Sequence, residues 1–269
     1  MRLGTSSPLK HENAKDWAAQ MKKLGLGSVV FPLDYKSDEK LINEYVEAAR
    51  ENDLVIAEVG AWCNPISIDK NVRDAAMERC IEQLKLADRI GAKCCVNVCG
   101  SAGDIWDGPY KENFSDEWFS RTVESIQKII DEANPKNTFY AIEPMPWMFP
   151  RNPDEYLKLI KAVNRERFAV HMDIVNWITS PEKYFFNEDF MDECFSKLRY
   201  YIKSCHLKNC WLRNEYTFQL VESSCEKGKL NLKKYISLAE KVDPQMPMII
   251  EHLTTDEEYI DSVKYVQGL

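Results

Sequence analysis

Four residues that can bind a metal ion lie near the ends of four successive apolar runs in the second half of the chain. They are Glu143, Asp173, His206 and Glu251, in the stretches YAIEP, AVHMD, SCHLK and MIIEH. Three carboxylates and one imidazole form a hard, mostly oxygen donor set, which suits Mn²⁺, Mg²⁺ or Co²⁺ better than a structural zinc. Taken singly, each glutamate could equally be a salt-bridge or loop-capping group, and His206 a core histidine.

These residues need a framework in which the ends of neighbouring strands meet. Short apolar runs alternate with longer amphipathic stretches, in which apolar positions recur at steps of three and four. The expected strands are residues 2–6, 28–33, 55–62, 94–101, 139–145, 168–175, 202–209 and 248–253. The expected helices are residues 14–24, 38–52, 72–90, 116–133, 154–163, 188–198, 232–242 and 256–266. Gly91 stands where the third helix should end.

Eight strand-like runs, each followed by a helix-like stretch, predict an α/β fold: a (β/α)₈ TIM barrel as a single domain over residues 1–269. The competing fold is a doubly wound parallel sheet. Such a sheet usually carries a glycine-rich phosphate turn after its first strand, and the stretch GTSSPLKHENA has none. In a barrel the carboxyl ends of the strands line the active site, so the four residues are expected at a common depth.

The amino-acid composition limits the kinds of molecule that the protein is expected to bind. The formal net charge of −8 opposes binding to nucleic-acid phosphates, and no window approaches the roughly 20 apolar residues of a membrane span. Nine cysteines without zinc-ribbon spacing are typical of a reduced, cytoplasmic protein. The apolar loop EKYFFNEDF could bury against a second copy, which leaves a homo-oligomer open.

The motifs AIEPMPW, VHMD, SCHLKN and IIEHL carry a resemblance to a known family. In their order and placement they resemble the xylose-isomerase-like superfamily, specifically its sugar phosphate isomerase/epimerase branch, over almost the whole chain. The resemblance implies a divalent metal, with Mn²⁺ preferred, held by Glu143, Asp173, His206 and Glu251. It also implies that Glu143 and Glu251 act as catalytic acid and base on opposite sides of a small carbohydrate substrate.

Further polar residues are candidates for the surroundings of this site. His171 shares a strand face with Asp173 and could support a ligand, bind substrate, or simply be a hydrogen-bonded core histidine. Lys208 could meet substrate oxygens, pair with a ligand carboxylate, or lie on the surface. Glu58 and Asn97 interrupt apolar strands and are expected to face the pocket mouth.

Loop residues complete the set of substrate-binding candidates. Trp62 and Trp147 follow the third and fifth strands and could form walls against sugar C–H surfaces. Arg213 follows the seventh strand, where epimerases of the family carry an arginine for substrate oxygens. Asn176 stands where those epimerases usually have a histidine, and many relatives have aspartate in place of Asn209. An asparagine can hydrogen-bond a hydroxyl but cannot transfer a proton at neutral pH.

The resulting prediction is a metal-dependent isomerase or epimerase that acts on a non-phosphorylated ketose, inosose or related polyol ketone through a metal-stabilised enediolate. The first alternative is a lyase with the same chemistry, such as a keto-inositol dehydratase or an enzyme that cleaves 3-keto-C-glycosides. A second alternative is an inactive barrel that serves as a sensor or subunit. Asn176 and Asn209 suggest it, because they replace the histidine and aspartate usual in relatives. An endonuclease with a three-metal cluster would need early histidines, and the only one is His11.

Overall fold

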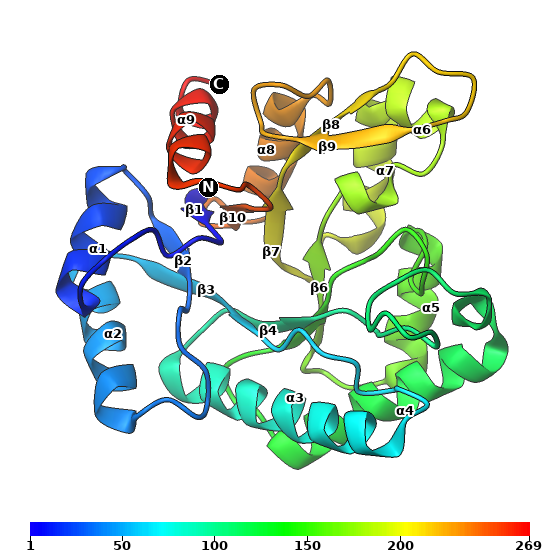
Figure 1. The fold of residues 1–269 in the computed structure, drawn as a ribbon, viewed down its shortest axis with the longest axis horizontal. Coiled ribbons are helices and arrows are strands. Elements are labelled where there is room, and N and C mark those ends of the chain that lie inside the picture. Colours follow the sequence, from blue (N-terminus) through cyan, green and yellow to red (C-terminus); the bar gives the residue numbers. More distant parts are fainter.

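The protein is a barrel of eight parallel strands surrounded by helices, seen in a computed structural model that describes residues 1–269 (Figure 1). The barrel strands follow one another around the sheet in the order β1-β10-β7-β6-β5-β4-β3-β2. Their bounds are β1 Arg2–Thr5, β2 Ser28–Val30, β3 Val55–Gly60, β4 Cys94–Asn97, β5 Tyr140–Ile142, β6 Phe168–Met172, β7 Ile202–Leu207 and β10 Pro247–Ile250. The prediction of a TIM barrel is confirmed.

The helices cover the outside of the barrel, and all except α7, whose N-cap is Phe186, begin at polar capping residues. They are α1 Ala14–Lys23, α2 Glu39–Glu51, α3 Lys70–Ile90, α4 Asp116–Ala133, α5 Pro153–Val163, α6 Pro181–Phe185, α7 Asn187–Leu198, α8 Leu232–Val242 and α9 Asp256–Gln267. Asp38, Asp69 and Thr255, for example, accept hydrogen bonds from the first-turn N–H groups of α2, α3 and α9. Gly91 ends α3 with φ +74°, as predicted.

The seam between β1 and β2 is where the barrel closes. No ladder pairs these two strands, but the Gly27 N–H donates to the Leu3 carbonyl at 2.9 Å, so the cylinder is nearly closed. A Cβ atom on Gly4 would lie 2.6 Å from the Ser28 carbonyl oxygen. Only glycine therefore allows the two backbones to approach this closely.

The core has an outer and an inner part. Most large apolar side chains pack between the sheet and the helices in one cluster of 62 buried residues. Inside the barrel, a separate small cluster consists of Cys94, Val96, Ala141 and Ala169. Small side chains on these strands leave room inside the barrel for polar groups on the other strands.

The region after β7 departs from the simple alternation that the sequence predicts. An antiparallel hairpin, β8 Asn209–Leu212 and β9 Leu220–Ser223, precedes α8 and projects beyond the barrel beside α6 (Figure 1). Asn209 anchors it, because its side chain donates to the Cys225 carbonyl at 3.1 Å and accepts from the Leu230 N–H at 2.9 Å. The expected seventh strand of residues 202–209 therefore ends early.

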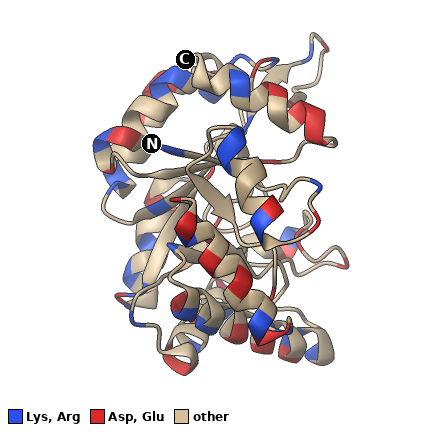
Figure 2. Cartoon of the chain, turned by 90° about the vertical axis from the view of Figure 1, so that its left-hand side faces the viewer, with Lys and Arg blue, Asp and Glu red and all other residues tan.

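The outer surface carries charges of both signs, interspersed along the helices on the side shown in Figure 2. Several form pairs one helical turn apart, such as Lys70–Asp74 and Lys197–Glu193. Pairs of this exposed kind contribute little to stability. No helix is both long and apolar enough to span a bilayer.

Candidate metal centre

Glu143, Asp173, His206 and Glu251 converge at the carboxyl ends of β5, β6, β7 and β10, which are neighbours in the sheet. One ligand-type atom from each lies within 4.8 Å of the others, and all four residues are buried. The His206 Nδ1 atom is 2.9 Å from Glu251 Oε1, 3.3 Å from Glu143 Oε1 and 3.9 Å from Asp173 Oδ2. Glu143 and Glu251 stand at the two ends of this row, with Asp173 and His206 between them.

Local hydrogen bonds orient the two carboxylates nearest β6. The Asn176 N–H donates to Asp173 Oδ1 at 3.2 Å, and the Asn176 side-chain amide donates to Glu143 Oε1 at 2.9 Å. Asn176 lies in a single turn of 3₁₀ helix, Val175–Trp177, immediately after β6. This asparagine therefore fixes two members of the cluster at once, and its amide is committed to Glu143 and to the Pro144 carbonyl.

Lys208 is a buried cation inside the cluster. Its ammonium nitrogen is 2.8 Å from Asp173 Oδ2 and 2.7 Å from Glu251 Oε1. Of the alternatives that the sequence left open, pairing with these carboxylates is the one observed. Burial alone would lower the pKa of Lys208, but Asp173 and Glu251 outweigh it and hold that pKa well above its ordinary value.

The arrangement fits a divalent cation. Asp173 Oδ2 and His206 Nδ1 are both buried and make no hydrogen bond of good geometry, although the Lys208 ammonium lies 2.8 Å from the first and Glu251 Oε1 2.9 Å from the second. Burial opposes a charge on His206, yet Glu251, Glu143 and Glu58 together raise its pKa well above the ordinary value. The centre therefore favours positive charge, and its oxygen-rich donors match those of Mn²⁺ or Mg²⁺.

The two glutamates have different environments. Burial, with the nearby charges of Glu251 and Asp173, raises the pKa of Glu143 to about 7, although His206 opposes the shift. Burial would also raise the pKa of Glu251, but His206 and Lys208 hold it well below its ordinary value. A pair of carboxyl groups with such separated pKa values can divide the roles of acid and base.

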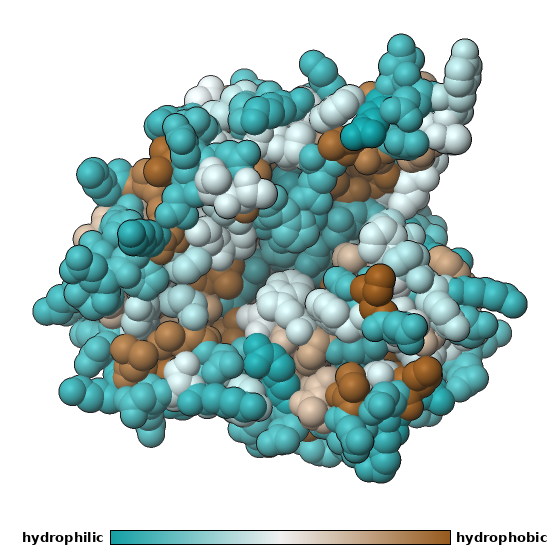
Figure 3. Space-filling model, viewed as in Figure 1, coloured by the Kyte–Doolittle hydropathy of each residue, from teal (hydrophilic) through white to brown (hydrophobic).

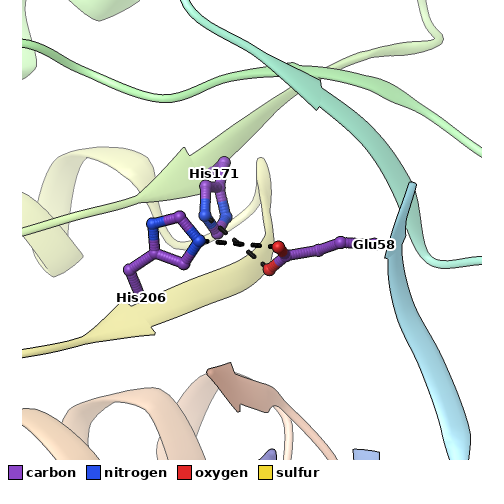
Figure 4. A group of neighbouring side chains, drawn as sticks. All are labelled: Glu58, His171 and His206. Carbon is purple, nitrogen blue, oxygen red and sulfur yellow. Dashed lines mark ion pairs between the residues drawn. The ribbon is translucent and has the colours of Figure 1, made fainter. Parts of the chain in front are cut away.

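Deeper in the barrel, Glu58 on β3 faces His171 on β6 and His206 on β7 (Figure 4). Glu58 Oε1 lies 3.7 Å from His171 Nε2, and Oε2 lies 3.5 Å from His206 Nε2. The Ser204 hydroxyl donates to Glu58 Oε1. Burial lowers the pKa of His171 to about 4, so its ring is neutral at pH 7. Glu58 thus lies below the four-residue cluster, and the expectation that it faces the pocket mouth is wrong.

Trp62 and the segment after β10 border the cluster on its open side. The Trp62 ring stacks at 6.4 Å from the His206 ring and remains 40% exposed, as a wall residue would be. Glu222 and His252 pair at 2.9 Å and help to line a cavity of about 550 Å³. His252 Nε2 is 3.4 Å from Glu251 Oε2, so this cavity adjoins the cluster. The face shown in Figure 3 is hollowed near its centre, with hydrophilic residues in the hollow.

Two predicted substrate residues lie elsewhere, and the wall role of a third, Trp147, stays a prediction. The Asn97 amide points outward and donates to the Cys63 carbonyl and the Tyr140 hydroxyl, so it holds the loop after β3 rather than facing the pocket. Arg213 lies at the exposed end of the β8–β9 hairpin, 3.8 Å from Glu215. The Trp147 indole N–H donates to the Asp107 carbonyl in the loop between β4 and α4.

Sequence reasoning missed three residues that contact the cluster or the Glu58 carboxylate below it. Ser204 lies two residues before His206 on the same strand face, and His252 directly follows Glu251, so spacing alone could have indicated both. Glu222 comes from the unpredicted hairpin and carried no such signal. It brings a carboxylate within 3.8 Å of the Lys208 ammonium.

A family comparison agrees with the barrel fold. The model of the xylose isomerase-like TIM barrel family matches residues 10–268. The chain belongs to this family. No curated protein sequence matches this xylose isomerase-like barrel.

Three solved structures share the fold. A probable 3-DHS dehydratase of Bacillus anthracis, involved in petrobactin synthesis, is 14% identical with a TM-score of 0.75, over 99% of both chains. The 3-keto-D-glucoside 4-epimerase of E. coli is 13% identical with a TM-score of 0.72, over 100% of both chains. A xylose isomerase-like TIM barrel protein of Mycobacterium smegmatis in complex with magnesium is 17% identical with a TM-score of 0.69, over 98% of this chain and 92% of that one.

Proposed function

We propose that this protein is a divalent-metal-dependent sugar isomerase or epimerase that acts on a non-phosphorylated ketose, inosose or related polyol ketone. The observation that carries the proposal is the buried row of Glu143, Asp173, His206 and Glu251 at the ends of four adjacent strands. The same fold carries 3-keto-D-glucoside epimerisation in E. coli and holds magnesium in the mycobacterial protein, which supports a metal and a carbohydrate here.

All four residues of the row would hold the ion, with Mn²⁺ preferred. A bound divalent cation supplies stabilisation of the negative charge that develops on neighbouring substrate oxygens. The protein's own contribution is proton exchange with carbon. Glu143 and Glu251 flank the centre, so one can take the proton next to the carbonyl and the other can return it to the second carbon or to the other face.

Other residues orient these groups. Asn176 holds Glu143 through its amide, and Lys208 pairs with Asp173 and Glu251 and helps to hold the pKa of Glu251 low. Trp62 offers an apolar face that a sugar ring could stack on while shielding the centre from water. His171 and Glu58 lie beneath the cluster, which limits them to support from below rather than contact with a sugar.

The adjoining cavity favours an uncharged substrate. Its charged lining includes two carboxylates, Glu222 and Glu258, besides Lys227 and His252. Gly228, the one glycine in the turn before α8, is packed against Asn209, where a Cβ would lie 2.0 Å from Cγ. That turn therefore serves the hairpin anchor, and a sugar without phosphate suits the cavity better than a sugar phosphate.

We also infer a reducing, cytoplasmic setting, which the nine unpaired cysteines support. Phe185 and Phe186 are 66% and 61% exposed on the loop around α6. Two exposed phenylalanines side by side support contact with a second copy of the chain.

The test is turnover of a pool of ketoses and inososes by chelator-treated protein, with and without added Mn²⁺, in D₂O. Mass spectrometry and NMR should show metal-dependent deuterium at a carbon next to the carbonyl, with the carbon skeleton and oxygens retained. Glu143→Gln and Glu251→Gln should lose the exchange, whereas Glu47→Gln, at an exposed carboxylate on α2 that pairs with Arg50, should keep it. Exchange that survives both row substitutions would contradict the assignment.

A lyase is the second candidate, because Lys208 places a buried ammonium beside Glu251 that could protonate a departing hydroxyl. The dehydratase of similar fold adds support. In the same experiment a lyase would produce loss of water or an aglycone. Protein that binds no divalent metal would instead favour a non-catalytic barrel.

A further inference from the structure

The group of Glu58, His171 and His206 is a second cluster of metal-ligand side chains, below the oxygen-rich row (Figure 4). Its three ligand-type atoms lie within 4.8 Å of one another, and all three residues are buried. They come from β3, β6 and β7, and two strands separate β3 from β6 in the sheet. The group therefore spans the inside of the barrel from one wall to the other.

His171 is the residue that needs an explanation. Its side chain is completely buried, and neither Nδ1 nor Nε2 has a hydrogen-bond partner. A buried polar group without a partner costs about 1–3 kcal/mol, so native proteins rarely leave an entire imidazole unsatisfied. Figure 4 shows the ring directed at the Glu58 carboxylate, beside the ring of His206.

The distances suit a shared ion better than hydrogen bonds. The separations of 3.7 Å from His171 Nε2 and 3.5 Å from His206 Nε2 to Glu58 are longer than the usual 2.7–3.2 Å for N–H···O bonds. In a tetrahedral site with metal–ligand bonds of about 2.0–2.1 Å, neighbouring ligand atoms lie roughly 3.4 Å apart. The two observed nitrogen–oxygen distances, 3.7 Å and 3.5 Å, are close to that value.

We propose that Glu58, His171 and His206 form a second metal site for a borderline transition ion such as Zn²⁺ or Co²⁺, distinct from the oxygen-rich centre. Two imidazoles and one carboxylate are a donor set that zinc accepts, with a further position for water. His206 contributes Nδ1 to the upper centre and Nε2 to the lower one. With both sites occupied its ring would bridge the two ions, and every proton on its two ring nitrogens would be released to solvent.

Ser204 completes the lower site without binding the ion. Its hydroxyl donates to Glu58, which orients the carboxylate toward the two imidazoles. Ligand carboxylates are commonly held by such outer hydrogen bonds. An ion here would tie β3 to β6 and β7 across the barrel, so it should also raise the unfolding temperature.

The test is titration of the chelator-treated full chain with Co²⁺, followed by visible absorption and by metal analysis after dialysis. Four- or five-coordinate Co²⁺ in the lower site should give a strong visible band, and six-coordinate Co²⁺ in the upper site a weak one. Wild-type protein should bind two ions per chain. His171→Asn and Glu58→Gln should each lose one ion together with the strong band, whereas Asp173→Asn should keep the strong band.

His11→Asn is the matched control, because the His11 ring hydrogen-bonds with the Leu9 carbonyl and the Tyr45 hydroxyl and belongs to neither centre. It should keep both ions. Wild-type protein that shows no strong band would overturn the proposal without any variant, and so would a strong band that persists in His171→Asn. A strong band without the weak one would support the lower site and count against the proposed function, so the two failures are distinguishable.

Discussion

Removing the charge of Lys208 should destabilise the metal-free protein strongly. Its ammonium lies 2.7 Å from Glu251 and 2.8 Å from Asp173, and its side chain is buried. At an effective dielectric constant of about 20, each contact amounts to roughly 6 kcal/mol of attraction, which desolvation of the ions largely offsets. Because Lys208→Met leaves two carboxylates buried without their partner, we expect a loss of about 3–5 kcal/mol in unfolding free energy.

A divalent ion should restore part of this loss, because it compensates the charge of the same carboxylates. By linkage, Lys208→Met should then bind Mn²⁺ about 10- to 30-fold more tightly than wild type, equivalent to roughly 1.4–2 kcal/mol. Urea unfolding with and without Mn²⁺, together with calorimetric titration, measures both quantities.

Lys197→Met is the matched control. Its ammonium has contacts of the same lengths, 2.8 Å to Asp154 and 2.7 Å to Glu193, but lies at the surface. That substitution should cost no more than about 1 kcal/mol and leave Mn²⁺ affinity unchanged. Equal losses in the two variants, or a weaker affinity for Mn²⁺ in Lys208→Met, would refute the reasoning.

Three further substitutions test the surroundings. Asn176→Ala removes the amide donor to Glu143 and should weaken Mn²⁺ binding about 10-fold by calorimetry; unchanged affinity would argue against that supporting role. Gly228→Ala should cost about 1–3 kcal/mol in urea unfolding, because its Cβ would collide with Asn209, and a neutral result would mean that the hairpin anchor yields easily. Asp88 accepts three backbone N–H bonds at the start of β5, which lower its pKa despite burial. The unfolding free energy of wild type should therefore exceed that of Asp88→Asn by about 1–2 kcal/mol at pH 7. This difference should disappear as the pH falls below about 4 and through the lowered pKa of Asp88 in the folded protein. A difference in unfolding free energy that persists at pH 2 would contradict this.

The barrel and the row of ligands could be predicted because local patterns repeat eight times. Each βα unit can be recognised in the sequence by an apolar run, a polar helix cap and an amphipathic stretch. The last four barrel strands each carry one ligand-type residue near the end. Strand alternation also placed His171 correctly on the face of Asp173, inside the barrel. The register between strands needed no separate information, because closure of a parallel barrel brings all strand ends to one rim.

Asn97 was predicted on the wrong face of its strand because the polarity of its side chain was given more weight than the in–out alternation of strand residues. Cys94 and Val96 face the barrel interior, so the period of two puts Asn97 on the outer face, where its amide binds Cys63 and Tyr140. Arg213 was misplaced for a different reason. The hairpin that carries it has weak local signals, and its position depends on Asn209 bonds to residues 16 and 21 positions away.

The most direct test of the account is a crystal structure with Mn²⁺ and a bound ketose or polyol. We expect an anomalous peak between Glu143, Asp173, His206 and Glu251, with ligand distances of about 2.0–2.3 Å, and a sugar carbon between the two glutamates. A peak away from these four residues, or a sugar bound with both glutamates on one side, would contradict the proposed chemistry.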